Sequence, residues 1–217
     1  MVLGKHLRLV MVISAALITG ILLSSALYAV TGFSLFGSPF GYNLIDSDSS
    51  NAELVEMAYT VVEHIKQNDY RDLARYVHPE LGVVFSPYAT ITLKPNLRFN
   101  AEQVAAFGSD RDSYIWGVRD GSGEPIDLTP DAYFSEFVFA RDFSLAPVIG
   151  VNHIVRLGNA LENITEVFPD VQFVDFHFPG SDADSMDGLS WITLRLGFEE
   201  FDGQLRLTVI ARSVWTA

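Results

Sequence analysis

Apolar residues in the stretch from 54 to 65 recur at the three- and four-residue spacing of an amphipathic helix. The positions are Leu54, Val55, Ala58, Val61, Val62 and Ile65. Asn68 and Asp69 interrupt the pattern, and the segment YRDLARYV that follows predicts a second short helix. This helix has to end before Pro79, because the residue that precedes a proline avoids helical geometry.

Alternating β-branched, aromatic and polar residues predict strands in the rest of the chain. The segment GVVFSPYATITL favours strands that are broken at Pro87. Near the C-terminus, VQFVDFHFPG, LSWITLRLGFEEF and GQLRLTVIARSVWT predict three antiparallel strands, with FDGQ at 201–204 as a hairpin turn.

Two further helices are indicated by their capping residues. Asn100 is a suitable N-cap for the helix AEQVAAF, and Thr129 followed by Pro130 is a helix start that leads into PDAYFSEFVFA. Helices in the first part of the chain and a meander of strands in the last part predict an α+β fold. In such a fold the sheet buries one face against the helices.

The N-terminal residues predict a membrane segment. Lys5, His6 and Arg8 precede a stretch without charged residues from 9 to 33, which is long enough to cross a bilayer as a helix. The positive end is expected to stay in the cytoplasm, so the rest of the chain is expected to be extracytoplasmic. The alternative is a cleaved signal peptide and a secreted protein, for which SSA at 24–26 offers small residues. The uncharged stretch is longer than the usual signal core, which favours an anchor.

The composition predicts three parts of the chain. Residues 1–33 form the anchor or signal segment, residues 34–51 are rich in Gly, Ser and Asp as expected of a flexible tether, and residues 52–217 form the extracytoplasmic domain. With 217 residues and 49% hydrophobic composition the chain is long enough to bury the core of one globular domain.

Charge and cysteine content exclude several classes of function. The formal net charge of −13 repels the phosphates of nucleic acid, so nucleic acid is not an expected partner. The sequence has no cysteine, which excludes disulfides, a thiolate nucleophile and cysteine-ligated zinc.

The run VVEHIKQNDYRDLARYVHPELGVVFSPYA resembles the opening of the NTF2-like (SnoaL-like) superfamily, in which a cone of helices is wrapped by a curved sheet. The segments YVHPELGVVFSPY, WGVRDGSGEPI, FHFPG and LRLGFEEFDGQ are more closely similar to an uncharacterised extracytoplasmic domain of Gram-positive bacterial envelope proteins. This resemblance covers most of 52–217 and implies export and the NTF2-like fold, but no known reaction. Many members are lipid-anchored, whereas this chain lacks the cysteine that a lipid anchor needs.

The candidates for acid–base chemistry are His78, Asp120 and His177. The resemblance places Ser86 where isomerases of the superfamily carry a carboxylate that abstracts a proton. A hydroxyl without an adjacent base cannot do this near neutral pH, which argues against an isomerase. Without a spacing motif, the two histidines are better explained as structural residues at a helix end and on a strand.

The loop DGSGEPIDLTPD resembles a calcium-binding loop in part. Asp120, Ser122 and Glu124 alternate like the first ligands of such a loop, and Asp131 falls at the twelfth position. Pro125 replaces the glycine of the turn, and Asp131 is already explained by the first turn of a capped helix. The favoured interpretation is a turn without metal, with calcium as the alternative cofactor.

The sequence therefore favours a non-catalytic, membrane-tethered domain that binds a small molecule, a peptide or a component of the cell envelope. The candidate ligand-binding residues are Ser86, Tyr88, Trp116 and His177. Two alternatives remain open, an NTF2-like hydrolase or isomerase that uses histidine and aspartate, and a domain that mediates protein contacts. A polar cavity with converging ionisable groups would favour the enzyme, and an apolar pocket with few polar groups would favour binding.

Overall fold

The first predicted helix is α2 (Ala52–Gln67) in the computed structural model, which describes residues 43–44, 51–93, 97–180 and 189–216. All six apolar positions of the pattern are buried, as expected for a helix whose apolar side covers a core. The helix ends at Asn68, which adopts a left-handed conformation with φ of 53° and donates its N–H to the carbonyl of Ile65 at 3.1 Å.

The other helices are short and begin at capping side chains. Asp69 accepts from the N–H of Asp72, Asn100 and Gln103 form a reciprocal capping box, and Thr129 accepts from the N–H of Ala132. The helical elements after α2 are α3 (Tyr70–Leu73), η2 (Ala74–Tyr76), α4 (Ala101–Ala106), α5 (Pro130–Tyr133), η4 (Phe134–Val138), η5 (Phe143–Leu145) and α6 (Ile164–Val167). The predicted helix after Thr129 is thus shorter in α-helical form than expected, because its second half, η4, continues as a π-helical turn.

The described residues form one seven-stranded sheet, in the order β1-β6-β7-β8-β9-β2-β3, and a separate hairpin of β4 and β5. The strands are β1 (Asn43–Leu44), β2 (Val83–Ser86), β3 (Arg98–Phe99), β4 (Tyr114–Val118), β5 (Pro125–Leu128), β6 (Val148–Val151), β7 (Gln172–Phe178), β8 (Ile192–Phe201) and β9 (Gln204–Val214). Strands β6 to β9 are antiparallel neighbours, whereas β1 pairs with β6 and β2 pairs with β9 in parallel. The three predicted C-terminal strands are confirmed.

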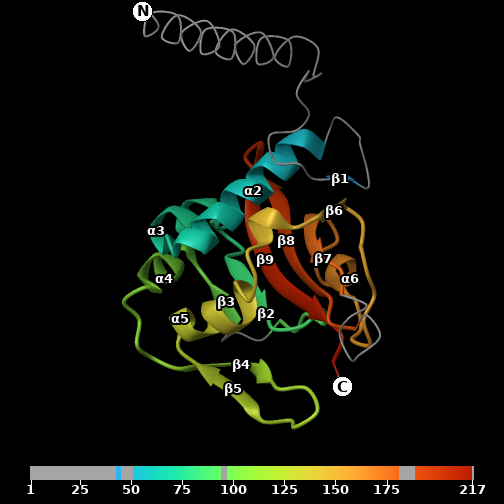
Figure 1. Ribbon diagram of the computed structural model, residues 1–217. Coiled ribbons are helices and arrows are strands. Elements are labelled where there is room, and N and C mark those ends of the chain that lie inside the picture. The colour runs from blue at the N-terminus through green and yellow to red at the C-terminus, as the bar shows by residue number, and fades with distance from the viewer. Residues whose placement is uncertain (1–42, 45–50, 94–96, 181–188, 217) are drawn as a thin grey trace, which may run out of the picture. The chain divides into compact units, whose positions relative to one another are not determined.

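The long strands β8 and β9 curve as they cross the molecule (Figure 1). They are joined by the predicted turn, in which Asp202 and Gly203 have φ values of 51° and 73°. Two successive residues with positive φ form the tight turn that suits the twist of a hairpin. The molecule is therefore an α+β protein with a curved, mainly antiparallel sheet.

One face of the sheet packs against the helices and the β4–β5 hairpin (Figure 1). Its core is rich in aromatic side chains that contact one another, namely Phe85, Phe99, Phe107, Trp116, Tyr133 and Phe134. Trp116 and Tyr133 stack with their ring centroids 3.9 Å apart. This face corresponds to the expected packing of sheet on helices.

The opposite face of the sheet is buried as well. The connection between β6 and β7, which includes α6, packs there in a second apolar cluster. Ile164 and Phe168 of this connection share the cluster with Phe173 on β7 and Val209 on β9. Burial of this second face was not expected from the sequence, because this connection lacks the long periodic pattern from which packing is recognised.

Residues 42–217 form one structural unit. Within the described ranges, no helix has the length and apolar character needed to cross a membrane. The predicted anchor, 1–33, and most of the predicted tether, 34–51, lie outside the described residues.

Candidate functional site

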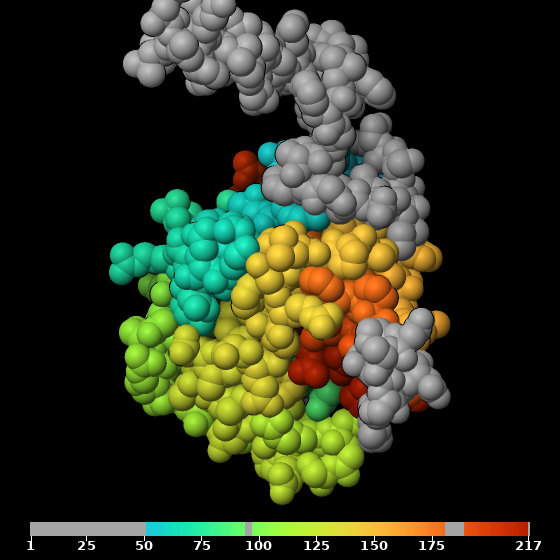
Figure 2. Space-filling view, viewed as in Figure 1, coloured from blue at the N-terminus to red at the C-terminus, as the bar shows by residue number. Residues whose placement is uncertain are grey.

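A pocket of about 630 Å³ opens at the end of the sheet where β2 and β9 stop. Three segments form its walls, namely the residues from Ser86 to Thr92, the hairpin residues from Trp116 to Gly123, and a third wall made by Asn159, Ala160 and Thr216. Figure 2 shows the surface hollowed between the hairpin and the red C-terminal strands, with green atoms of the segment that follows β2 at the bottom.

The first wall follows from the proline that ends β2. Beyond Pro87 the chain bends back on itself, and the buried hydroxyl of Ser86 lies 2.7 Å from the carbonyl oxygen of Tyr88 and 3.1 Å from that of Thr90. The one proton of this hydroxyl is thus shared between two carbonyls that lie outside the described strands. Its role in the pocket is therefore to fix the shape of this wall.

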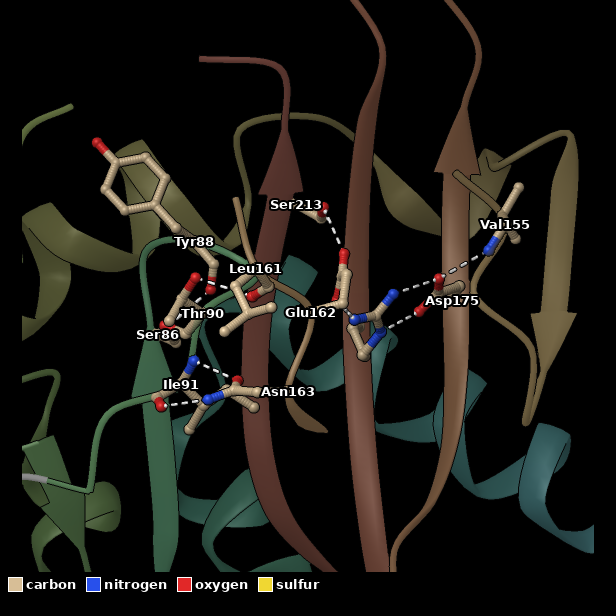
Figure 3. A network of polar contacts seen from close by, with 11 residues as sticks. Ser86, Tyr88, Thr90, Ile91, Val155, Leu161, Glu162, Asn163, Asp175 and Ser213 are labelled. Carbon is tan, nitrogen blue, oxygen red and sulfur yellow. Dashed lines mark hydrogen bonds and ion pairs between the residues drawn. The ribbon is translucent and has the colours of Figure 1, made fainter. Parts of the chain in front are cut away.

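The bend is attached to the β6–β7 connection by side chains (Figure 3). The amide of Asn163 accepts from the N–H of Ile91 at 2.8 Å and donates to the carbonyl of the same residue at 3.0 Å. The hydroxyl of Thr90 donates to the carbonyl of Leu161 at 2.8 Å. The side chain of Asn163 thereby makes the two hydrogen bonds that a neighbouring strand would make with Ile91. These bonds attach the first wall to the β6–β7 connection, which also contributes residues to the third wall.

The second wall is the β4–β5 hairpin, which is fixed by its tryptophan. Trp116 is fully buried, and its indole N–H donates to the carbonyl of Leu128 on the other strand at 2.8 Å. Gly117 lies against Pro87 of the first wall, where an added Cβ would come within 3.1 Å of the proline ring. A glycine at this position therefore lets the two walls touch.

The third wall joins the C-terminal residues to the β6–β7 connection. The amide of Asn159 donates to the carbonyl of Thr216 at 2.5 Å. Its oxygen accepts from the N–H of Thr216 at 3.1 Å and from the hydroxyl at 2.9 Å. Three bonds between one pair of residues hold Thr216 in the wall of the pocket.

A buried ionic network fastens this connection to the sheet behind the pocket (Figure 3). Arg195 on β8 donates to both carboxylate oxygens of Asp175 on β7, at 2.6 and 2.8 Å, and also to Glu162 of the connection. Glu162 accepts in addition from the hydroxyl of Ser213 at 3.1 Å. The N–H of Val155, at the other end of the connection, donates to Asp175 at 3.2 Å.

The ion pairs of this network offset the cost of burying its charged side chains. Arg195 is 1% exposed and Asp175 is fully buried. Burial alone would lower the pKa of Arg195, but Asp175 and Glu162 raise it well above its usual range. Breaking a buried pair on one side is costly, because it leaves the other charge without a partner in a dry interior. The network is therefore expected to hold the connection rigidly against the sheet.

Arg119 and Asp120 are the charged side chains of the pocket wall. Arg119 donates to both oxygens of Glu136, at 2.6 and 3.3 Å, and hydrogen bonding to this guanidinium lowers the pKa of Glu136. The backbone N–H of Asp120 donates to the hydroxyl of Tyr88 at 3.0 Å. Tyr88 thus connects the first wall to the turn of the hairpin.

Four residues named from the sequence meet at this pocket. They come from two segments that are far apart in the chain, and all of them line the pocket: Ser86, Tyr88, Trp116 and Asp120. The residues of the third wall were not recognised from the sequence. Asn159 and Ala160 lie in a segment without periodicity or a motif, so the sequence contains no signal for their position.

His177 does not join this group. It lies on β7, on the sheet face that carries Asp175, and its Nδ1 is 2.8 Å from the hydroxyl of Thr193. Its ring is buried, and this burial lowers the pKa of His177 below its ordinary value. Burial in the sheet and the contact with Thr193 are therefore sufficient to explain a histidine at this position.

His78 lies at the other end of β8 from His177. Its Nδ1 accepts from the N–H groups of Glu80 and Leu81, at 3.2 and 3.0 Å, and its ring contacts Phe201. It therefore stabilises the turn that leads into β2. The three acid–base candidates, His78, Asp120 and His177, are thus placed at separate positions.

The calcium candidates are also spread over two elements. Ser122 accepts from the N–H of Glu124 at 3.3 Å in the hairpin turn, whereas Asp131 lies in α5 and accepts from the hydroxyl of Tyr70 at 3.2 Å. Among the described residues, the group of three histidine or acidic side chains whose ligand atoms lie within 4.8 Å of one another is His64, Asp69 and Asp72. The acids of the loop, including Asp120, are not gathered around a common point.

No protein-family model and no curated protein matches the sequence. Solved structures that resemble the chain include a protein from Xanthomonas campestris that is described as an association domain of calcium/calmodulin-dependent protein kinase II, with 15% identity and a TM-score of 0.35. This match covers 80% of the present chain and 93% of the other. Aln2 from a Streptomyces species matches with 11% identity and a TM-score of 0.34, over 78% of this chain and 93% of that one. Similarity at this level leaves the function to be inferred from the site itself.

Proposed function

We propose that this protein is a non-catalytic binding domain that takes a small molecule into the pocket between the bend after β2 and the β4–β5 hairpin. The observation that carries this proposal is the pocket itself. Its volume of about 630 Å³ falls within the range of roughly 300–1,000 Å³ that is typical of small-molecule sites. Its lining combines aromatic and apolar side chains with hydroxyl groups, one amide and two charged groups, those of Arg119 and Asp120.

The composition of the walls favours binding over catalysis. Among the described residues that line the pocket, Asp120 is the one carboxylate, and there is no histidine, cysteine, lysine or glutamate to work with it. Its arginine, Arg119, is already held by Glu136. General acid–base catalysis needs a proton donor or acceptor within reach of the reacting group. The enzyme alternative also requires His78, Asp120 and His177 in one place, and the fold separates them.

The rigid construction of the pocket supports the same proposal. Each wall is fixed by side chains that bond backbone groups, such as Ser86, Asn163 and Trp116. A preformed site binds a small ligand more tightly because little conformational entropy is lost on binding.

The NTF2-like assignment and the cellular location form part of this proposal. The resemblance of VVEHIKQNDYRDLARYVHPELGVVFSPYA and the α+β architecture support an NTF2-like domain. The uncharged stretch 9–33 supports a domain that is held at the outer side of a membrane by residues 1–33. In that position the ligand would come from the extracytoplasmic space or the envelope.

A variant that fills the pocket tests the proposal. The neutral fluorescent probe N-phenyl-1-naphthylamine is titrated against the structural unit, residues 42–217, and against the same domain with Ala160→Trp. Ala160 is a partly buried residue of the third wall, so the indole is expected to occupy the space of the probe. We expect saturable binding by the native domain and at least a tenfold loss in the variant, about 1.4 kcal/mol.

The control is Ala106→Trp, which adds the same side chain at an exposed position at the end of α4. This variant should bind the probe like the native domain, and near-ultraviolet circular dichroism should show that all three proteins are folded. Absence of saturable binding by the native domain, or equal binding by Ala160→Trp, would overturn the proposal.

A further inference from the structure

Arg212 occupies a position in β9 where the sheet pattern calls for an apolar side chain. It follows Ile210 on the face that packs against the helices, and it pairs across the strands with Leu194, which is fully buried. The guanidinium is half-buried and lies over the ring of Phe137, 5.2 Å from its centroid. A cation is thus inserted at the edge of an aromatic core.

Arg212 has no acceptor among the described residues. Its Nε is buried without a hydrogen-bond partner, and none of the described carboxylates forms an ion pair with it. The negative charge of Glu136 attracts Arg212 without a hydrogen bond between them, because the Glu136 carboxylate is bonded to Arg119. Burial lowers the pKa of Arg212, which reflects the cost of keeping this charge away from water.

Two other arginines show that this situation is unusual in the molecule. Arg195 is more deeply buried, but it has two carboxylate partners. The Nε of Arg206 is buried without a partner, but its other nitrogens donate to the carbonyl of Arg75 at 2.9 Å and to Gln204 at 2.6 Å. Among the described arginines, Arg212 alone combines a buried Nε that has no partner with a lack of acceptors for its other nitrogens.

Arg212 is not one of the residues that line the pocket, but it lies beside residues that do. Phe137 contacts both the guanidinium of Arg212 and that of Arg119, and its ring lies 6.5 Å from the ring of Tyr88. Arg119 and Tyr88 are pocket residues. The unpartnered cation therefore lies next to the wall that Tyr88 and Arg119 form.

We infer that Arg212 binds the negatively charged group of an amphiphilic organic anion, whose apolar part lies against the aromatic residues of the pocket. This inference rests on the proposed binding function and specifies its ligand class. The planar guanidinium matches the oxygens of a carboxylate or sulfonate and supplies charge-assisted hydrogen bonds. A bound anion would pair with the buried charge of Arg212. Because the protein has a net charge of −13 and repels anions as a whole, an anionic ligand needs a local positive group of this kind.

Two probes with the same rings test the inference. 8-Anilinonaphthalene-1-sulfonate carries a sulfonate, whereas N-phenyl-1-naphthylamine has the same aromatic rings without a charge. We expect the native domain to bind the sulfonate probe more tightly than the neutral one. Arg212→Met should weaken the sulfonate probe by roughly tenfold or more, the factor expected from one charge-assisted hydrogen bond, and should leave the neutral probe within about twofold.

Two further variants complete the experiment. Arg212→Lys keeps the charge but lacks the planar group, so its affinity for the sulfonate probe should lie between those of the native domain and Arg212→Met. Arg75→Met removes one positive charge from a side chain that is 78% exposed and outside the pocket wall, and it should have no effect on either probe. Near-ultraviolet circular dichroism excludes binding of the sulfonate probe to a loosened core.

The outcomes separate this inference from the proposed function. Failure of both probes to bind the native domain overturns both. Binding of the neutral probe that is lost in Ala160→Trp, with no effect of Arg212→Met on the sulfonate probe, overturns the role of Arg212 and leaves the pocket intact as a binding site. Equal losses in Arg212→Met and Arg75→Met would show that the overall charge, and not Arg212, attracts the anion.

Discussion

Arg195 and Arg212 lie on neighbouring strands, face opposite sides of the same sheet, and differ in their partners. Arg195 has Asp175 and Glu162, and Arg212 has no acceptor among the described residues. The same substitution should therefore have opposite effects on stability at the two positions. This contrast separates an arginine that supports the fold from one that is available to a ligand.

We predict that Arg212→Met raises the melting temperature and that Arg195→Met lowers it. Removing an unpaired buried charge stabilises a domain by about 1 kcal/mol, or roughly 2–4 °C at this size. Removing Arg195 leaves Asp175 and Glu162 unpaired and should cost about 3–5 kcal/mol. Thermal unfolding followed by circular dichroism measures both. A similar drop in the two variants would mean that Arg212 is a structural residue.

His177 should make stability depend on pH. Burial lowers its pKa below the ordinary value of 6.5; nearby Asp175 raises it in part, and Arg156 adds to the lowering. The unfolded chain therefore takes up the proton first as the pH falls. The contribution of His177 to stability is complete above pH 6.5 and is lost as the pH falls from there through the folded-state pKa.

The corresponding prediction compares melting temperatures between pH 7.5 and 5.5. His177→Gln can still bond Thr193 but does not titrate, so its melting temperature should fall less over this interval than that of the native domain. His153→Gln, a change at an exposed histidine, should behave like the native domain. If the native domain and His177→Gln lose stability in parallel, acid sensitivity arises from other groups.

At the scale of elements, Asn163 joins two segments that no strand pairing connects. Its side chain makes both bonds that Ile91 would otherwise make with a neighbouring strand. Asn163→Ala leaves these two backbone groups without partners and should destabilise the domain by about 1–3 kcal/mol. Hydrogen exchange measured by NMR should show a faster rate at the amide of Ile91. Protection like that of the native domain would show that other contacts hold the wall.

Asn163→Asp serves as the matched comparison. It keeps the acceptor for the N–H of Ile91 and loses the donor to its carbonyl, so both stability and exchange should be intermediate. The affinity for N-phenyl-1-naphthylamine should follow the same order in the three proteins, because Asn163 supports the first wall of the proposed site.

The elements that the sequence predicted are those with local signals. Periodicity identified α2, capping residues identified α4 and α5, and the pair Asp202 and Gly203 identified the hairpin of β8 and β9. The packing of the β6–β7 connection on the sheet was not predicted. Its contacts join residues that are far apart in the chain, such as Asn163 and Ile91, and its own pattern is irregular.

The lining of the candidate pocket also joins segments that are far apart in the chain. Ser86 was named from the resemblance to isomerases of the NTF2-like superfamily, and Tyr88 and Trp116 were named as aromatic residues; the structure places all three in the lining of one pocket. His177 was grouped with them but lies on the other face of its strand from the helices, next to Asp175. Arg212 was not singled out, because one arginine in a strand gives no indication of whether it has a partner.

At the scale of the whole molecule, the predicted anchor can be tested directly. The full chain should sediment with phospholipid vesicles after reconstitution and resist extraction at high salt, because residues 9–33 carry no charge over a length that spans a bilayer. Residues 34–217 alone should remain in the supernatant. Recovery of the full chain in the supernatant would refute the anchor.

Mass spectrometry of the protein from a bacterial host separates the two forms of export. An intact N-terminus in the membrane fraction supports the anchor, whereas a secreted protein that begins shortly after residue 26 supports a cleaved signal peptide. The choice decides whether the proposed ligand is bound at the membrane surface or in free solution.

The β3 edge of the sheet limits how the domain can associate with itself. The strand at this edge, β3, is two residues long, whereas the central strands β8 and β9 have ten and eleven residues. A long open edge invites strand addition and aggregation, and a short edge offers few backbone groups to an incoming chain. Contacts that copies of this domain make at the β3 edge therefore have to rely on side chains, and a mutation that lengthened β3 would create a route to aggregation.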